Sequence, residues 1–298
     1  MFARYYKQFL ILPAALSLLS LLALFVWGLR PGIDLAGGSL LQISYPSGRP
    51  AVEAVESAVK PLNLGEMRIQ ATGDAGYLIR MRDLSVNEKN ALEQSLGSLG
   101  QMQEDQYTSI GPSIGAEILH KGYLAIGLIV VCIILFIAFA FRHVSEPVAS
   151  WKYGVIAIVT LVHDILVPAG IFAVLGRFAG AEIDSLFIVA LLTILGISIN
   201  DTIVVFDRIR ENLRAGAPRR DRGTFAEIVG LSIRQTLARS INTSLTVVIV
   251  LLALFFAGPV ATRYFALTLL AGMIAGTYSS MLLAAPLLVL WEKRAARR

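Results

Sequence analysis

The sequence lacks most of the residue patterns on which soluble enzymes rely. Cys132 is the only cysteine, so no disulfide can form within the chain and no cysteine-based zinc motif exists. The three histidines, His120, His143 and His163, do not have the spacing of metal ligands. A Walker sequence, a nucleophile elbow and a dinucleotide fingerprint are also missing, so we expect no enzyme activity, no metal and no cofactor.

Charged residues are scarce as well. They make up 16% of the 298 residues, against about a quarter in soluble domains, while 56% of the residues are hydrophobic. The mean hydropathy is +0.68. Apolar runs long enough to cross about 30 Å of hydrocarbon occur six times, at 9–28, 122–141, 152–175, 186–206, 241–257 and 264–290. We expect the first run to be an uncleaved helix, and the last to tilt or end early near Pro286.

The basic residues predict an orientation in the bilayer. Sixteen of the 26 lysines and arginines fall before the first run, in 142–152, in 207–239 or after Trp291. The short opposite loops, near Arg177 and Arg263, hold one each. Basic residues in short loops mark the cytoplasmic side, so both termini are expected inside. The net charge of +5 follows from this bias and does not indicate a nucleic-acid partner.

One segment, 29–120, has the pattern of a folded domain outside the membrane. Its sequence predicts strand, helix, strand, strand, helix, strand, with a hairpin turn at 73–76 and a capping box from Ser85 to Glu88. The order βαββαβ is typical of a ferredoxin-like domain. The predicted fold class is therefore an α-helical integral membrane protein with six transmembrane helices and one extracytoplasmic α+β domain between the first two.

The second large segment outside the spans is a basic cytoplasmic loop, 207–240. Thr224 and Glu227 form another capping box there, and apolar residues recur after it at helical spacing. This pattern predicts an amphipathic helix lying on the membrane surface before the fifth span. The expected organisation is 1–28 as the N-terminus and first span, 29–120 as the external domain, and 121–298 as the remaining spans.

Charged groups within the spans are the candidates for function. Asp164 lies near the middle of the third span, and Asp201 lies near the inner end of the fourth, at a depth that Arg239 could share. An ionised aspartate at the centre of a membrane helix costs about 2.5–3.5 kcal/mol on insertion scales, so its presence favours a use such as proton relay.

Structural interpretations of the same residues stay open. Asp201 and Asn200 could cap or bridge helices, and Asp164 with His163 could be a buried structural pair. Arg239 could simply extend its side chain to the lipid headgroups. Gly272 and Gly276 form a GxxxG sequence, a helix-packing signal that also arises by chance.

Six stretches of the sequence, in order along the chain, resemble the SecD/SecF family of the resistance-nodulation-division superfamily. They are GIDLAGGS (32–39), IGPSIGAEI (110–118), LVHDILVPAG, GISINDTIVVFDRIREN, LARSINTSLT and GTYSSMLLAAPLLVLWEK. Leu35 and Ser39 depart from the usual family sequence. The external region is short, which resembles the SecF members more than the SecD members.

The resemblance implies partners and a function. Members of the SecF type pair with SecD and use the proton gradient to help draw a preprotein through the SecYEG channel after SecA has driven it in. YidC and YajC are further partners that the resemblance implies. A proton-coupled exporter of small molecules or lipids, and a scaffold that moves no protons, are the alternatives.

The resemblance also implies roles for particular residues. Asp201 matches the proton-relay carboxylate of the fourth span, Arg239 the arginine that opens the fifth, and Asp164 the His-Asp pair of the third. Four further residues would have structural or coupling roles: Asn200, Asp34, Gly37 and Gly38.

Overall fold

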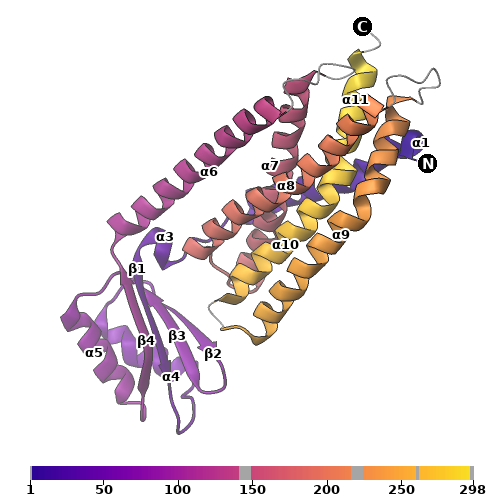
Figure 1. The fold of residues 1–298 in the computed structure, drawn as a ribbon. Coiled ribbons are helices and arrows are strands. Elements are labelled where there is room, and N and C mark those ends of the chain that lie inside the picture. The colour runs from indigo at the N-terminus through magenta and orange to yellow at the C-terminus, as the bar shows by residue number, and fades with distance from the viewer. Residues whose placement is uncertain (1, 141–148, 216–223, 260–261, 296–298) are drawn as a thin grey trace. The chain divides into compact units, whose positions relative to one another are not determined.

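The computed structural model describes residues 2–140, 149–215, 224–259 and 262–295. His143 and the centre of the predicted basic loop lie outside the described residues. The chain divides into two compact units, and each is described by itself. One is built from membrane-type helices and the other around a small sheet (Figure 1).

The helical unit contains six stretches that are long and apolar enough to span a membrane, as the sequence predicts. They are α1 with α2 (Phe2–Phe9, Ile11–Trp27), α6 (Pro112–Ala140), α7 (Ser150–Phe178), α8 (Ser185–Ala215), α9 (Phe225–Ala257), and α10 (Arg263–Ser279) continued by η3 (Ser280–Ala284) and α11 (Ala285–Ala295). In the most apolar stretch of each membrane helix, 61% of the residues are buried in α7 and 67% in α10–α11, but only 6% in α6. Helices α7 and α10–α11 therefore form the centre of this unit, and α6 lies at its edge.

We expected the last membrane helix to tilt or to end early near Pro286, and the structure shows that it does not end there. The chain stays helical from Arg263 to Ala295, with a π turn at Ser280–Ala284 just before the proline. A proline ring clashes with the carbonyl four residues earlier in a regular α-helix. The wider π turn directly precedes Pro286, and the amide of Ala285 bonds there to the carbonyl of Ser280, five residues back.

The segment before the fifth span also differs from the prediction. The sequence predicts a separate amphipathic helix at the membrane surface, but α9 runs without a break from Phe225 to Ala257. The predicted capping box does start it, because the amide of Thr224 bonds to Glu227. No proline interrupts the helix after that point, and its buried residues, Phe225, Val229, Ser232, Thr236 and Ser240, form one stripe that packs inward.

The second unit comprises Pro31–Tyr123 with Ile183–Ser185. Its sheet has the order β2-β3-β1-β4 with all neighbours antiparallel, from β1 (Gly38–Ser44), β2 (Arg68–Thr72), β3 (Gly76–Met81) and β4 (Gln103–Ile110). Helices α4 (Val52–Val59) and α5 (Val86–Gly97) pack on one face of the sheet (Figure 1). This arrangement confirms the predicted ferredoxin-like βαββαβ domain.

Alternation along the strands explains why one face is covered. Leu41 and Ile43 of β1 and Ile79 of β3 are fully buried, whereas the residues between them are less buried. Side chains alternate between the faces of a strand, so the apolar set of each strand points to the helices. Leu92 and Leu96 of α5 are also fully buried and complete this core.

The N-terminus of α5 makes a testable electrostatic contribution to this domain. The Arg82 guanidinium, bonded to Glu88, and the Ser85 amide lower the pKa of Glu88 from 4.5 to about 2. A carboxyl group whose pKa is lower in the folded than in the unfolded state stabilises the fold at pH values above the unfolded-state pKa. This stabilisation is lost as the pH falls through the folded-state pKa. We expect protection of the α5 amides against hydrogen exchange to decline as the pH falls from about 4.5 toward 2.

Substituting Glu88→Gln should remove this part of the pH dependence. Glu66→Gln is the matched control, because Glu66 is exposed and lies in the loop before β2. An unchanged pH profile in the Glu88→Gln protein would show that this carboxylate does not link the domain to pH.

Candidate functional site

Hydrogen-bonding side chains gather at the centre of the helical unit. Buried members of this cluster are His163, Asp164, Ser198, Ser240, Ser279 and Ser280, and Asp201 lies half-buried beside them. They come from α7, α8, α9 and the junction of α10 with η3. Burying a polar group is costly unless it is hydrogen-bonded, so each bond in this cluster bears on its stability.

Asp164 of α7 is fully buried and accepts hydrogen bonds from three side chains. Nδ1 of His163 is hydrogen-bonded to Oδ1 over 2.9 Å, Ser279 donates to Oδ2 over 3.0 Å, and Ser198 also donates to Oδ2. The Tyr278 hydroxyl lies 3.2 Å from Nε2 of His163, which suits an imidazole that carries its proton on Nδ1. The carboxylate thus joins α7 to both α8 and α10.

Asp201 of α8 has two hydroxyl partners on two other helices. Ser240 of α9 donates to Oδ1 over 2.6 Å, and Ser280 of η3 donates to Oδ2 over 2.9 Å. A serine hydroxyl can donate to an ionised carboxylate and can equally accept from a protonated one. Asp201 can therefore stay hydrogen-bonded in either protonation state.

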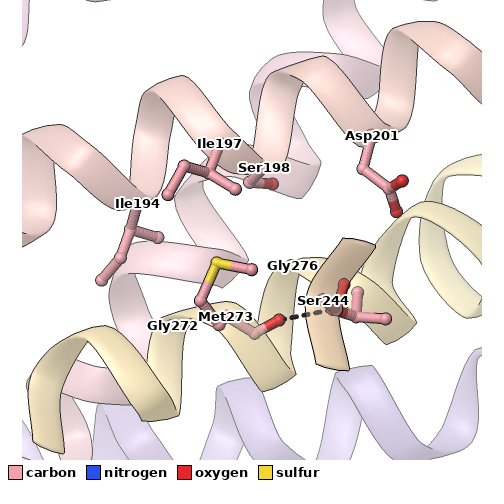
Figure 2. A pocket seen from close by; sticks show the side chains of 9 residues that line it. Ile194, Ile197, Ser198, Asp201, Ser244, Gly272, Met273 and Gly276 are labelled. Carbon is pink, nitrogen blue, oxygen red and sulfur yellow. Dashed lines mark hydrogen bonds between the residues drawn. The ribbon is translucent and has the colours of Figure 1, made fainter. Parts of the chain in front are cut away.

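A small cavity lies next to Asp201 between α8 and α10 (Figure 2). About 20 Å³ of it is open to water-sized molecules, which is enough for a single water. Its polar lining consists of Asp201, Ser198, Ser244 and Thr277, and Thr277 donates to Ser244 over 2.6 Å. A water placed here would have the polar partners that it needs, so the cavity can supply a proton carrier beside the carboxylate.

The GxxxG sequence forms the wall of this cavity and contacts α8. A Cβ atom on Gly272 would lie 2.2 Å from Cδ1 of Ile194, and one on Gly276 would lie 3.1 Å from Cβ of Ser198. Figure 2 shows both glycines on the helix that faces Ile194 and Ser198. The sequence left open whether this motif arose by chance, and the structure shows that it brings α8 and α10 close together.

Two of the site residues predicted in the membrane helices are not part of the cluster. Arg239 is exposed on α9, and among the described residues no ion pair joins it to Asp201. Its neighbour Ser240 bonds to Asp201 instead, because successive helical residues point about 100° apart. Asn200 is exposed as well, and its side chain points away from the buried face that carries Asp201's neighbours Ser198 and Thr202.

Sequence reasoning missed the serines that surround the two carboxylates: Ser198, Ser240, Ser279 and Ser280. A serine in an apolar run carries no charge and leaves the hydropathy almost unchanged, so it does not stand out. The adjacent pair in TYSSM was a usable signal, because two neighbouring hydroxyls in a membrane helix need internal partners. The π turn that begins at Ser280 is a second indication, since such turns are frequent at functional sites.

The glycine pair of the external unit makes close backbone contacts. Gly37 and Gly38 have φ values of 78° and 135°, which residues with a side chain rarely adopt. A Cβ atom on Gly37 would lie 2.6 Å from Cα of Pro112, and one on Gly38 would lie 2.6 Å from the carbonyl oxygen of Met81. The pair therefore lets this turn lie against both β3 and the start of α6.

Asp34 lies in the same segment and holds the first residue of α8. Its Oδ2 accepts from the amide of Ser185 over 3.2 Å and from the Ser185 hydroxyl over 2.6 Å. The amide of Gly32 also bonds to the carbonyl of Ile183 over 2.8 Å. A carboxylate at this position satisfies an amide that the helix itself leaves unpaired. Asp34 is thus a cap for α8, supplied by a distant part of the chain.

Metal chemistry has no support among the residues that the structure describes. No group of three histidine, cysteine, aspartate or glutamate side chains lies close enough together to hold an ion. What the site offers is two carboxylates, several hydroxyls and a small polar cavity in a bundle of membrane helices.

These features define a multi-pass membrane protein of the transport type, with carboxylates between its helices. Residues 91–294 match the family described as "Protein export membrane protein SecD/SecF, C-terminal", and residues 22–45 match "SecD/SecF GG Motif". The chain belongs to the SecD/SecF family. It is a bacterial inner-membrane protein and an accessory subunit of the protein translocase.

Individual relatives agree with this assignment. The chain is 43% identical to the protein translocase subunit SecF of Thermobaculum terrenum, over 98% of this chain and 93% of the relative. It is 35% identical to SecF of Anaerolinea thermophila, over 96% and 92%. The crystal structure of SecDF from Thermus thermophilus, a translocon-associated membrane protein, superposes with a TM-score of 0.83 at 32% identity. This chain is covered to 98% there, but it spans only 38% of that SecDF chain.

The close approach of α8 and α10 can be tested with a pair of substitutions. Gly272→Ala should destabilise the protein by about 1–3 kcal/mol, because the new methyl group overlaps Ile194. We expect Ile194→Ala in the same chain to relieve part of this cost, so the two effects will not add. The measurement is the denaturation midpoint of the full chain in detergent.

Gly196→Ala is the control for this pair. A Cβ atom there has no neighbour within 4 Å, so the exchange should be neutral or slightly stabilising in the helix. Strict additivity of Gly272→Ala and Ile194→Ala would mean that the two positions do not touch.

Proposed function

We propose that the chain pairs with SecD and uses the proton motive force to promote late steps of preprotein translocation. The observation that carries this proposal is Asp201, a half-buried carboxylate in a membrane helix with hydroxyl partners on α9 and η3. The match to SecF of Thermobaculum terrenum over 93% of that relative, and the likeness to the SecDF structure, support the pairing with SecD.

A proton relay is the physical role that suits Asp201. A carboxylate surrounded by hydroxyls can load and release a proton while it stays hydrogen-bonded to at least one of them. Each proton that crosses the membrane delivers about 2.3 kcal/mol per 100 mV. That energy is enough to shift a conformational equilibrium severalfold, and the movement of α8 would carry the effect along the chain.

For Arg239 we propose a contact with the SecD half and no direct contact with Asp201. It is exposed on α9, one residue from Ser240, which binds Asp201. An exposed arginine in a membrane helix is costly in contact with lipid alone, so its position supports a contact with the SecD half. Asp164 is proposed as a second carboxylate of the relay, held by His163, Ser198 and Ser279.

The proposed orientation follows from the basic residues. Both termini would be cytoplasmic and residues 29–120 would lie outside, because Lys and Arg concentrate in the loops on one side. The external domain could then contact the emerging preprotein or the external part of SecD. SecYEG would provide the channel and SecA the earlier driving step, with YidC and YajC as further partners. No enzyme activity and no cofactor are proposed.

Asp201→Asn is the first experimental test. In inner-membrane vesicles with the partner present and ATP exhausted, a proton gradient should speed completion of a half-translocated preprotein only in the wild type. We expect the gradient-dependent part to fall at least tenfold, because asparagine cannot load a proton.

Asp207→Asn is the matched control, since Asp207 is an exposed carboxylate on the same helix. A normal gradient response in Asp201→Asn would assign Asp201 a structural role. If even the wild type does not respond to the gradient, the exporter or scaffold alternatives would gain support.

We further propose that Asp34 couples the external domain to α8. The bonds of Asp34 to Ser185 support this role, because α8 is the helix that carries Asp201. Asp34→Ala should therefore lower gradient-dependent completion severalfold while leaving the SecA-driven phase nearly unchanged.

Asp74→Ala, in the exposed hairpin between β2 and β3, is the control for this substitution. Equal losses in the gradient-dependent and SecA-driven phases would indicate a folding defect instead of lost coupling. A full gradient response in Asp34→Ala would remove Asp34 from the coupling path.

A further inference from the structure

Two consecutive serines contact the buried carboxylate of Asp164 and the half-buried carboxylate of Asp201. Ser279 donates to Asp164 of α7 over 3.0 Å, and Ser280 donates to Asp201 of α8 over 2.9 Å. Successive residues of a helix point about 100° apart, so neighbouring hydroxyls can reach two different helices. Both serines are fully buried, and Ser280 opens the π turn.

Each serine also lies within reach of backbone carbonyls that compete with its carboxylate. The Ser279 hydroxyl is 3.1 Å from the carbonyl of Gly276. The Ser280 hydroxyl is 3.1 Å from the carbonyl of Thr277 and 3.4 Å from that of Gly276. A hydroxyl has only one proton to donate, so each serine must choose between a carboxylate and the backbone.

The carbonyl of Gly276 is an acceptor that the two serines share. When Asp201 is ionised, it holds the proton of Ser280, because bonds to a charged acceptor are about twice as strong as neutral ones. The Gly276 carbonyl is then available to Ser279. When Asp201 is protonated, Ser280 can turn to the carbonyls of Gly276 and Thr277, and Ser279 remains on Asp164.

We propose that Ser279 and Ser280 couple the protonation of Asp164 to that of Asp201, so that ionisation of one carboxylate disfavours ionisation of the other. With Asp201 ionised, the Gly276 carbonyl can accept from Ser279 whenever Asp164 is neutral, and this bond stabilises the neutral form of Asp164. With Asp201 protonated, Ser279 remains bonded to Asp164, and this bond stabilises the ionised form of Asp164. Repulsion between two like charges acts in the same direction.

The titratable groups around each carboxylate are few. His163 faces Asp164 from its own helix, and Tyr278 of α10 faces His163. Asp201 is hydrogen-bonded to Ser240 of α9 and to Ser280. The exposed Arg239 is the charged residue nearest to Ser240 in the sequence. His163 is hydrogen-bonded to Asp164 but not to Asp201, so among the described residues the serine pair is the group that joins the two sites.

This inference deepens the proposed relay and rests on it for its consequence in transport. A proton that arrives at Asp201 would favour departure of a proton from Asp164, so the pair would hold about one proton between them. Protonation of one carboxylate would then change hydrogen bonds on α7, α8 and α10 together, through two residues of a single turn.

The test measures the coupling itself, without transport. The full chain with its partner, in lipid, is titrated by infrared spectroscopy of the carbonyl stretch of protonated carboxyl groups. Asp201→Asn assigns the Asp201 band by its disappearance. Asp164→Asn, which is permanently neutral, should then lower the proton affinity of Asp201 about threefold to tenfold.

The decisive comparison repeats the Asp164→Asn shift in a chain that carries Ser279→Ala. We expect the shift to fall to a third or less, because the competition for the Gly276 carbonyl is gone. An undiminished shift would mean that charge repulsion alone joins the sites, and no shift in either chain would mean that they titrate independently. Each of these outcomes would overturn the proposal.

Two further variants keep the result interpretable. Ser279→Cys keeps nearly the same volume but donates weakly, so it should reduce the shift if the alanine variant fails to fold. Thr268→Val is the control, because the Thr268 hydroxyl bonds only to the carbonyl of Tyr264 among the described residues. Failure of the Asp201→Asn transport test would leave this titration unaffected, so the two proposals can fail separately.

Discussion

Hydrogen bonding inside the membrane is the constraint on which the rest of this structure depends. Hydrocarbon offers no partner to a buried carboxylate, so Asp164 and Asp201 must find theirs on neighbouring helices. The donors are short hydroxyls, which require the helices to approach closely. The glycines at 272 and 276 permit that approach between α8 and α10. Packing and polar chemistry are therefore not separate features of this bundle.

The same constraint explains the irregular part of the last helix. Ser279 and Ser280 serve two different helices, and the π turn begins where this double contact occurs. A proline follows directly after the turn, and the widened backbone accommodates it. A regular helix would leave the ring of Pro286 against a carbonyl, so the turn serves the geometry of the site and of the chain that follows it.

The unit built around the sheet contains close contacts between segments that are far apart in the sequence. Gly37 and Gly38 allow contacts that any Cβ atom would block, and Asp34 caps the first turn of α8. Asp34 bonds to the first residue of α8, and Asp201 lies within the same helix. The coupling proposed above for Asp34 rests on this shared helix.

The sequence by itself determined the six apolar helices, the βαββαβ order and both capping boxes, because these depend on composition and on short-range periodicity. It also marked Asp164 and Asp201, since a charge in an apolar run is conspicuous. Only the tertiary structure decided that Ser240 rather than Arg239 meets Asp201, that α9 is one continuous helix, and that Ser279 and Ser280 reach separate carboxylates. Those outcomes depend on which helices become neighbours and on the angle at which each side chain leaves its helix. The local sequence determines neither the neighbouring helices nor these angles.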